Sequence, residues 1–387
     1  MKVTHKIAKT PLAKPYFVGD EIENILQVLK NDKHDLAEGA FAEKCEILLK
    51  NGVGSKKIFL TNSCTAALEM AGILADIQPG DEVIMPSFTF PSTANAFVLR
   101  GAIPIFIDIR EDTLNIDEKL IVPAITAKTK AIVPVHYAGV ACEMKTINAI
   151  ANQHGLIVIE DAAQAISAKY HSQALGSCGH LAAFSFHFTK NITSGLGGCL
   201  LLNDESFLAQ AEIIYHKGTN RSAYLRQEID RYNWVDVGSS FMSSELTNAL
   251  LFTQLQKLTK ITEARLSIWN RYHHAFQQSE LNQMVKRPSI PAGCQHNGHI
   301  YYLLLPNKYY RDQFIKELNS QNIGATFHFV PLHNSPGGIK YGKTASDMQF
   351  TESLSERLVR LPIWPGLEPY LDDMIATMLE SLNKVLH

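Results

Sequence analysis

Three short polar segments, each at the end of an apolar run, carry the side chains that could do chemistry. They are TNSCTAAL (61–68), LIVIEDAAQA (156–165) and SFHFTKNITSGLGG (185–198). A short apolar run bounded in this way is typical of a strand buried on both faces of a parallel sheet. Parallel sheets bind ligands at the carboxyl ends of their strands, so we expect the three segments to meet in one site.

The first segment, 61–68, joins a strand to a helix and offers backbone N–H groups and hydroxyls to a phosphate. The alternative is a simple helix N-cap, because Ser and Thr are favoured there without any ligand. The segment is not a nucleotide P-loop: GxxxxGK followed by Ser or Thr is absent, and so is GxGxxG. Both absences argue against an ATPase and against a nicotinamide-dependent oxidoreductase.

The second segment ends its apolar run in Glu160 and Asp161. A carboxylate at that point could hold a cationic ring nitrogen through a charge-assisted hydrogen bond worth roughly 1.5–3 kcal/mol. The alternative is an acidic cap on a following helix. Gln164 lies three residues beyond Asp161, where a helical turn would return it to the same site or let it act as a cap.

The third segment contains Lys190 shortly after its apolar run and ahead of a glycine-rich turn. An isolated lysine is ordinarily a solvated surface residue. A lysine partly buried beside other cations has a lowered pKa and supplies the neutral amine that attacks an aldehyde. A phosphate site, a carboxylate for a pyridinium nitrogen and a lysine for an aldehyde together match pyridoxal 5'-phosphate (PLP).

The elements that must position these segments alternate regularly along the first part of the chain. Apolar runs predict strands over 57–60, 82–86, 102–109, 130–135, 156–160, 181–188 and 199–203. Helical spacing predicts helices over 65–77, 92–101 and 143–155. This alternation predicts an α/β fold with a mainly parallel sheet flanked by helices.

The pattern changes after about residue 255, which predicts a large domain over 1–255 and a smaller C-terminal α/β domain over 256–387. Helices are expected over 254–278, 310–320 and 372–386, and extended segments over 299–306 and 324–333. The segment 334–350 is rich in Gly, Ser and Pro, so we expect a loop that is mobile or belongs to an active site.

The composition excludes several classes of function. With 36 Lys and Arg against 38 Asp and Glu, the net charge is −2, and no global field attracts nucleic acid or an anionic membrane. The six cysteines form no CxxC pair and no HExxH motif occurs, so we expect neither a disulfide framework nor a metal site. No apolar run has signal-peptide or transmembrane length, so we expect a soluble cytoplasmic protein.

Longer motifs extend this interpretation. NSCTAALEM, GDEVIMPSFTF, PVHYAGVACEM, EDAAQA, SFHFTKN and PLHNSP occur in the order found in nucleotide-sugar aminotransferases. From about residue 15 to its C-terminus the chain resembles the DegT/DnrJ/StrS family, whose PLP-dependent members have fold type I, the aspartate-aminotransferase-like fold. The stretch 63–101 is most similar to the dTDP-4-amino-4,6-dideoxygalactose transaminase branch of enterobacterial-type surface glycan synthesis.

The resemblance implies roles for four residues around the cofactor ring. Lys190 would form the Schiff base and move protons, and Asp161 would pair with the pyridine nitrogen. Phe90 would stack on the ring, and Gln164 would lie against its phenolic oxygen. Without the resemblance, Phe90 is equally well explained as a core aromatic residue after a strand.

The resemblance also implies how the phosphate is held. The backbone of Cys64 and Thr65 and the hydroxyl of Ser185 would bind it. A buried hydroxyl within an apolar run, such as that of Ser185, needs a partner. Ser240 stands where relatives often carry an Asn that reaches the phosphate of the neighbouring subunit, and Leu196 stands where they often carry Glu.

Three histidines are candidates for the sugar or diphosphate pocket. They are His187, His328 and His333. The alternative for each is a structural histidine whose ring is satisfied by its neighbours, because histidines between aromatic residues are more often of that kind.

The reaction implied is a ping-pong transfer of an amino group from L-glutamate to carbon 4 of dTDP-4-keto-6-deoxy-D-glucose, giving dTDP-4-amino-4,6-dideoxygalactose. A homodimer with shared active sites is also implied. The alternatives are an aminotransferase for a 3-keto, UDP-linked or GDP-linked sugar, and a PLP-binding regulator without catalysis. A related PLP-dependent dehydratase has His in place of the Schiff-base lysine, so Lys190 argues against that reaction.

Overall fold

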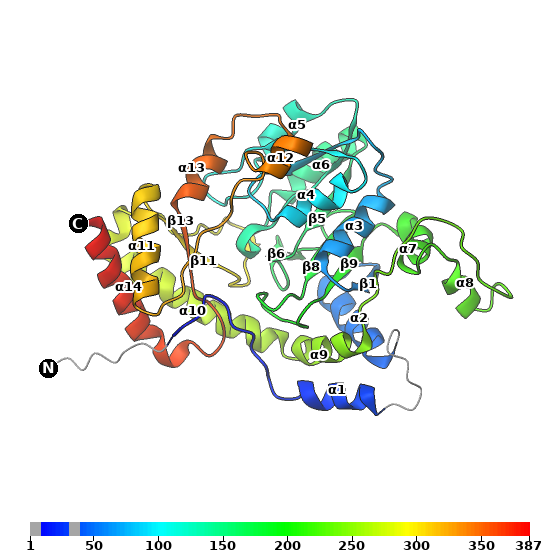
Figure 1. Cartoon of the computed structure of the whole chain (residues 1–387), viewed down its shortest axis with the longest axis horizontal. Helices are drawn as coiled ribbons and strands as arrows, with labels where there is room; N and C mark the ends of the chain where they lie inside the picture. Colours follow the sequence, from blue (N-terminus) through cyan, green and yellow to red (C-terminus); the bar gives the residue numbers. More distant parts are fainter. Residues whose placement is uncertain (1–8, 31–38) are drawn as a thin grey trace.

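The computed structural model describes residues 9–30 and 39–387 of the chain. The first eight residues of the N-terminal segment, which the sequence predicts to lack a signal peptide, lie outside the described residues. Figure 1 shows an elongated molecule with a central sheet and, at one end, a region built by the C-terminal part of the chain. Among the helices that the structure describes, none is both long and apolar enough to cross a membrane.

An eight-stranded sheet forms the centre, in the order β1-β9-β8-β5-β4-β2-β3-β12. Its strands are β1 (Lys57–Thr61), β2 (Glu82–Pro86), β3 (Ile103–Ile107), β4 (Thr129–Ile132), β5 (Ile157–Asp161), β8 (Leu181–Ser185), β9 (Gly198–Leu202) and β12 (Lys343–Thr344). Strand β9 runs antiparallel to both of its neighbours, and the other pairs are parallel. The predicted mainly parallel sheet is therefore confirmed.

Helices cover both faces of this sheet, as Figure 1 shows. One face carries α2 (Ala40–Val53), α5 (Ile121–Ala124), α6 (Met144–His154) and α9 (Glu245–Gln256). The other face carries α3 (Cys64–Leu74), α4 (Pro91–Val98) and α7 (Leu208–Tyr215). Because successive side chains of a strand point to opposite faces, covering both faces requires strands that are apolar throughout.

The C-terminal part of the chain builds a second core. It contains α10 (Leu258–Gln278), α11 (Lys308–Ser320), α14 (Leu371–Leu386) and the antiparallel pair β11 (Tyr301–Leu304) and β13 (Leu358–Leu361). The buried side chains of this core all come from residues 268–386. This separate core supports a domain division near residue 255, which we retain as a proposal.

The remaining elements are short or peripheral. They are α1 (Glu21–Leu29), α8 (Arg221–Leu225), α12 (Pro336–Tyr341), α13 (Gln349–Arg357), β6 (Lys169–Tyr170), β7 (Gln173–Ala174) and β10 (Cys294–Gln295). Short 3-10 helices lie at Glu118–Leu120, Tyr137–Gly139, Glu205–Phe207, Glu280–Gln283 and Glu368–Tyr370.

Three predicted segments differ from the structure. The helix expected over 254–278 is two helices, α9 and α10, which meet at the non-helical Lys257. The segment 324–333 forms no strand beyond one isolated bridge, between Thr326 and Arg360. The segment 334–350, expected to be a loop, contains α12 and also β12, which extends the sheet by pairing with β3.

Glu160 is a fully buried carboxylate that ties strand β5 to the turn at 176–179. It accepts hydrogen bonds from the backbone N–H groups of Gly176 (2.9 Å), Cys178 (2.7 Å) and Gly179 (2.6 Å). Its Oε2 also lies 2.8 Å from Nε2 of His136, which is itself fully buried. A buried charge is tolerated only when it is bonded in this way.

We expect Glu160→Gln to destabilise the fold strongly. The new NH2 group faces N–H donors, so at least two buried donors lose their acceptor. Each such loss costs about 1–3 kcal/mol, and the free energy of unfolding, measured in urea, should therefore fall by about 3 kcal/mol or more.

The control is Lys56→Ala, which removes an ion pair with Glu205 whose side chains are both exposed. That variant should change the free energy of unfolding by no more than about 0.5 kcal/mol. An equally small effect of Glu160→Gln would show that the carboxylate does not anchor the turn.

Candidate active site

A cavity of about 390 Å³ lies at the carboxyl ends of β5 and β8. Nine of the residues predicted from the sequence line it: Cys64, Thr65, Phe90, Asp161, Gln164, Ser185, His187, Lys190 and His328. The three polar segments, far apart in the sequence, therefore meet in one place. The wall opposite them comes from the C-terminal part of the chain.

One end of the cavity is suited to a phosphate. Ser63 caps α3, and its Oγ accepts a hydrogen bond from Ala66 N at 3.1 Å. The N–H groups of Cys64 and Thr65 have no acceptor within the described residues, as expected for the first turn of a helix. The hydroxyl of Ser185 accepts from His187 N at 3.4 Å, which leaves its own proton for a ligand.

A glycine allows this end of the cavity to form. A Cβ atom at Gly198 would lie 2.4 Å from the N atom of Cys64 and 2.7 Å from the carbonyl oxygen of Phe184. Strand β9 can therefore run directly beside the first turn of α3 only with glycine at this position.

Lys190 lies on the turn that follows β8 and is partly buried. Burial lowers the pKa of its amine, and the cation Arg360 acts in the same direction, whereas Cys64 and Asp161 oppose the shift. Burial also raises the pKa of the Cys64 thiol, which keeps that thiol neutral. Lys190 thus has the environment of a nucleophilic amine rather than that of a surface lysine.

Asp161 ends β5, and no helix follows it, which excludes the alternative of an acidic helix cap. Its carboxylate is buried and accepts from Oγ1 of Thr93 at 2.6 Å and from the N atom of Ala163 at 3.2 Å. A carboxylate has about four lone-pair positions, so further ones remain for a ligand.

Gln164 and Phe90 lie beside Asp161. The Oε1 atom of Gln164 accepts from Ala138 N at 2.7 Å, so its NH2 group is the part that can meet a ligand oxygen. Phe90 is the N-cap residue of α4 and is 60% exposed, so its ring is free to stack on a bound group. It is not a core aromatic residue.

Sequence reasoning missed Arg360, which contacts the predicted His328, and it also missed His299. Nη1 of Arg360 donates to Nε2 of His328 at 2.6 Å, and Nδ1 of His328 lies 3.4 Å from the hydroxyl of Tyr137. The Nε atom of Arg360 is buried and has no partner within the described residues. His299 also lines the cavity, with its Nδ1 2.7 Å from Oδ1 of Asn191.

This group has a distinct charge pattern. Burial, together with the cations Arg360 and Lys190, holds the pKa of His328 far below its ordinary range, and the pKa of His299 is lowered for the same reasons. The pKa of His187 is lowered by burial and by Lys190. The three imidazoles are therefore neutral at physiological pH, and Arg360 is a cation whose side chain contacts the neutral His328.

Two predicted residues lie outside the cavity of this chain. Ser240 is exposed, and its carbonyl oxygen accepts from Nδ2 of Asn62 at 3.2 Å. His333 contacts Oγ of Ser87 through Nδ1 at 2.7 Å and Oε1 of Glu352 through Nε2 at 3.1 Å. The structure therefore does not bring Ser240 and His333 together with the other candidates.

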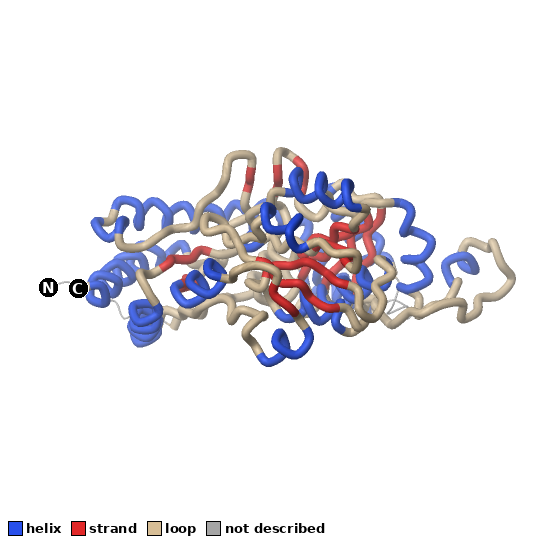
Figure 2. The backbone as a smooth tube through the Cα atoms, turned by 90° about the horizontal axis from the view of Figure 1, so that it is seen from above, coloured by secondary structure: helices blue, strands red, loops and turns tan. Residues whose placement is uncertain are grey.

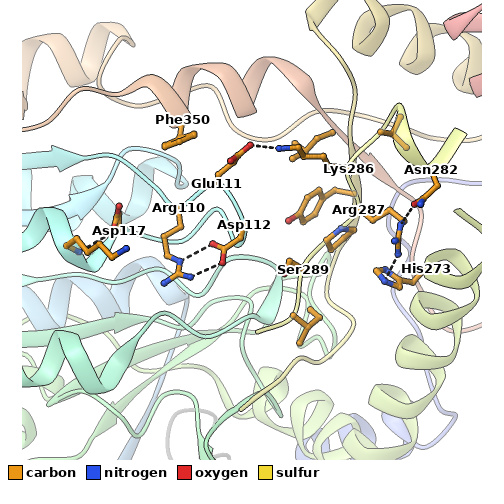
Figure 3. Close-up of a pocket in the computed structure, with 16 residues that line it drawn as sticks. Arg110, Glu111, Asp112, Asp117, His273, Asn282, Lys286, Arg287, Ser289 and Phe350 are labelled. Carbon is orange, nitrogen blue, oxygen red and sulfur yellow. Dashed lines mark hydrogen bonds and ion pairs between the residues drawn. The ribbon is translucent and has the colours of Figure 1, made fainter. Parts of the chain in front are cut away.

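A wider groove of about 860 Å³ lies elsewhere, between the loop at 110–119 and the segment 282–290. Figure 3 shows that two of its cations are paired with carboxylates: Arg110 with Asp112 at 2.8 Å, and Lys286 with Glu111. The groove contains none of the site residues predicted from the sequence, and no set of His, Cys, Asp and Glu suited to a metal occurs in the described part of the chain. We therefore assign the chemistry to the smaller cavity.

Comparison with known proteins gives the same answer. The sequence profile of the DegT/DnrJ/EryC1/StrS aminotransferase family matches residues 15–380. The chain is 35% identical over 383 residues to an uncharacterized protein of Methanocaldococcus jannaschii, with 97% of each chain covered. It is 34% identical over 384 residues to the spore coat polysaccharide biosynthesis protein SpsC of Bacillus subtilis, again with 97% of each covered.

Solved structures show the same fold. The putative sugar aminotransferase Spr1654 of Streptococcus pneumoniae, in its PLP form, superimposes with a TM-score of 0.90 at 24% identity, covering 98% of this chain and 100% of that one. The profile match extends over almost the whole chain, and both relatives exceed 30% identity along nearly their full length. The chain therefore belongs to the DegT/DnrJ/EryC1/StrS aminotransferase family, and the prediction of a PLP-dependent aminotransferase of fold type I is confirmed.

Proposed function

We propose that this enzyme transfers an amino group from L-glutamate to carbon 4 of dTDP-4-keto-6-deoxy-D-glucose, giving dTDP-4-amino-4,6-dideoxygalactose for a surface glycan. The observation that carries the aminotransferase assignment is the meeting of Lys190, Asp161 and the first turn of α3 in one cavity. The choice of nucleotide and of carbon 4 is supported by the motif resemblance over 63–101. The name of the relative SpsC supports a role in polysaccharide biosynthesis.

The residues present fit PLP. Free N–H groups of Cys64 and Thr65 and the hydroxyl of Ser185 would hold the phosphate, and Asp161 would hold a proton on the ring nitrogen. Bound PLP supplies an aldehyde that links to amines and a ring that withdraws electrons from the donor's α-carbon. Phe90 would cover one face of the ring, and the NH2 group of Gln164 would donate to its phenolic oxygen.

Lys190 has two tasks in this proposal. Its lowered pKa gives a neutral Nζ for attack on the aldehyde, and the same amine, once displaced by the donor, can take the proton from the donor's α-carbon. It lies on a short turn whose backbone is fixed by a hydrogen bond from Lys190 N to His187 O at 2.9 Å. The base is therefore held close to the reacting atoms.

Arg360 is our candidate for binding a carboxylate of the donor. Beside the amine of Lys190, the charged lining residues that the structure describes are one cation, Arg360, and one carboxylate, Asp161. The unpartnered Nε of Arg360 leaves a buried donor that an incoming carboxylate would satisfy. With Asp161 assigned to the ring nitrogen, Arg360 is the cation left to pair with a carboxylate of an acidic amino acid.

We further propose a cytoplasmic homodimer with shared active sites. Figures 1 and 2 show that the segment around α8 projects from the body, and its aromatic side chains Tyr232 and Trp234 are 50% and 81% exposed. Exposed apolar groups of this kind suit burial against a second copy. Ser240 pairs with His216 at the start of this projecting segment and lies outside the cavity of its own chain, which supports a contact in trans.

The cysteines support the proposed cytoplasmic location. All six are free, as expected for a reducing compartment.

The first test concerns Lys190. Purified protein mixed with PLP should show a visible absorption band that L-glutamate removes, and Lys190→Ala should lose both the band and at least about 10²-fold of the turnover rate. Lys56→Ala, an exposed lysine at the start of β1, is the matched control and should behave as the wild type does.

The other outcomes of this test separate the alternatives. If the wild type forms no band, the cofactor assignment is wrong. If the band forms but neither L-glutamate nor other amino donors change it, the protein is a PLP-binding regulator rather than a transaminase.

The second test concerns Arg360. Arg360→Met should raise the L-glutamate concentration needed for half-maximal loss of the visible band by about tenfold or more, because one charge-assisted hydrogen bond is lost. Arg357→Met is the control: its Nε donates to the carbonyl oxygen of Leu305 at 2.7 Å, outside the cavity. Unchanged glutamate dependence in Arg360→Met would rule out this role.

The third test concerns the sugar. In a panel of nucleotide-linked keto sugars, dTDP-4-keto-6-deoxy-D-glucose should have the highest kcat/KM, with the configuration of the product amine read by NMR. Loss of well-placed polar contacts costs an analogue at least about tenfold. Turnover restricted to a UDP-linked or 3-keto compound would replace our substrate with that one.

A further inference from the structure

The segment Thr89-Phe90-Pro91-Ser92-Thr93 leads from β2 into α4; Thr89, Phe90 and Ser92 line the cavity, and Thr93 contacts the lining residue Asp161. Oγ of Ser92 lies 2.8 Å from Oγ1 of Thr65, at the phosphate end. Phe90 presents its exposed ring to the middle of the cavity. Oγ1 of Thr93 donates to Oδ2 of Asp161 at 2.6 Å.

The hydrogen bonds within this segment have a fixed direction. An ionised carboxylate only accepts, so the single hydroxyl proton of Thr93 must point at Asp161. Oγ1 of Thr89 lies 2.8 Å from Oγ1 of Thr93, so Thr89 must be the donor of that pair. The two hydroxyl dipoles therefore align toward Asp161 and strengthen each other in a region where Thr89 is 1% and Thr93 is 0% exposed.

This chain of hydroxyls acts on a carboxylate in a charged environment. The titratable groups that face Asp161 are Lys190 and the Cys64 thiol, with Arg360 beyond Lys190. Thr93 is a strong neutral donor that binds the carboxylate of Asp161 from the side of α4. Removing it would leave the Asp161 carboxylate without its side-chain donor, so the carboxylate would no longer be held in this orientation.

We propose that Thr93, oriented by Thr89, is a positioning residue that holds the Asp161 carboxylate directed at the cofactor ring nitrogen. This inference rests on the proposed function, because it requires PLP in the cavity. Since Ser92 and Phe90 belong to the same segment, it also implies that the ring nitrogen, the ring face and the phosphate end are aligned by five consecutive residues.

The test is a pH titration of the visible absorption of the PLP-loaded enzyme. A proton held on the ring nitrogen disfavours a second positive charge at the Lys190 nitrogen, so the titration midpoint is low in the wild type. Thr93→Val keeps the shape but loses the hydroxyl, and its midpoint should rise by roughly one pH unit. Thr93→Ser keeps the hydroxyl and should restore the wild-type midpoint.

Thr351→Val is the matched control, because it also removes a hydrogen bond from a fully buried Thr to a buried Asp, the 2.7 Å bond to Asp108. It should leave the midpoint unchanged. An unchanged midpoint in Thr93→Val, or an equal rise in Thr93→Ser or Thr351→Val, would overturn the proposal for Thr93 while leaving the proposed function intact. Absence of a visible band from the wild type would overturn both.

Discussion

The site depends on two adjacent carboxylates, Glu160 and Asp161, at the end of β5. Successive side chains of a strand point to opposite faces, so these two must serve different environments. On one face Glu160 is saturated by three N–H groups and by His136, and it fixes the turn that leads into β8. On the other face Asp161 keeps lone pairs for a ligand. A register shift of one residue would exchange the positions of Glu160, which anchors the turn, and Asp161, which faces the cavity.

Electrostatics explain why the cavity suits an anionic cofactor and would suit the acidic donor that we propose. Burial disfavours the charged form of every ionisable group. It therefore lowers the pKa of His328 and His299, which stay neutral, and it also lowers the pKa of Lys190. Burial lowers the pKa of Arg360 as well, but a guanidinium stays protonated in proteins. Arg360 therefore supplies a permanent positive charge to the cavity. Its neutral partner His328 orients the guanidinium without cancelling that charge.

Sequence reasoning predicted the half of the site that local pattern encodes. The apolar runs and the polar residues at their ends located Lys190, Asp161 and the first turn of α3. This was possible because parallel sheets bind ligands at the carboxyl ends of their strands. Arg360 and His299 were missed because they come from the C-terminal part of the chain, whose position against the sheet no local pattern specifies. An arginine within the apolar run LVRLPIW was the available signal for Arg360. Thr93 was missed because a threonine in the first turn of a helix already has a local explanation.

The failure to predict the form of segment 324–333 has a physical cause that bears on the site. This segment connects the C-terminal core to the loop after β2 and does not pair as a strand within either part. Near its start, Thr326 exchanges backbone hydrogen bonds with Arg360, the shorter being 2.7 Å. Near its end, Leu332 N and His333 N donate to the backbone oxygen and the Oγ of Ser87, at 3.0 Å and 2.9 Å. His328 lies between these two attachments, so the wall that orients Arg360 is held by both the C-terminal core and the loop after β2. A movement of one core relative to the other would therefore strain the segment that carries His328.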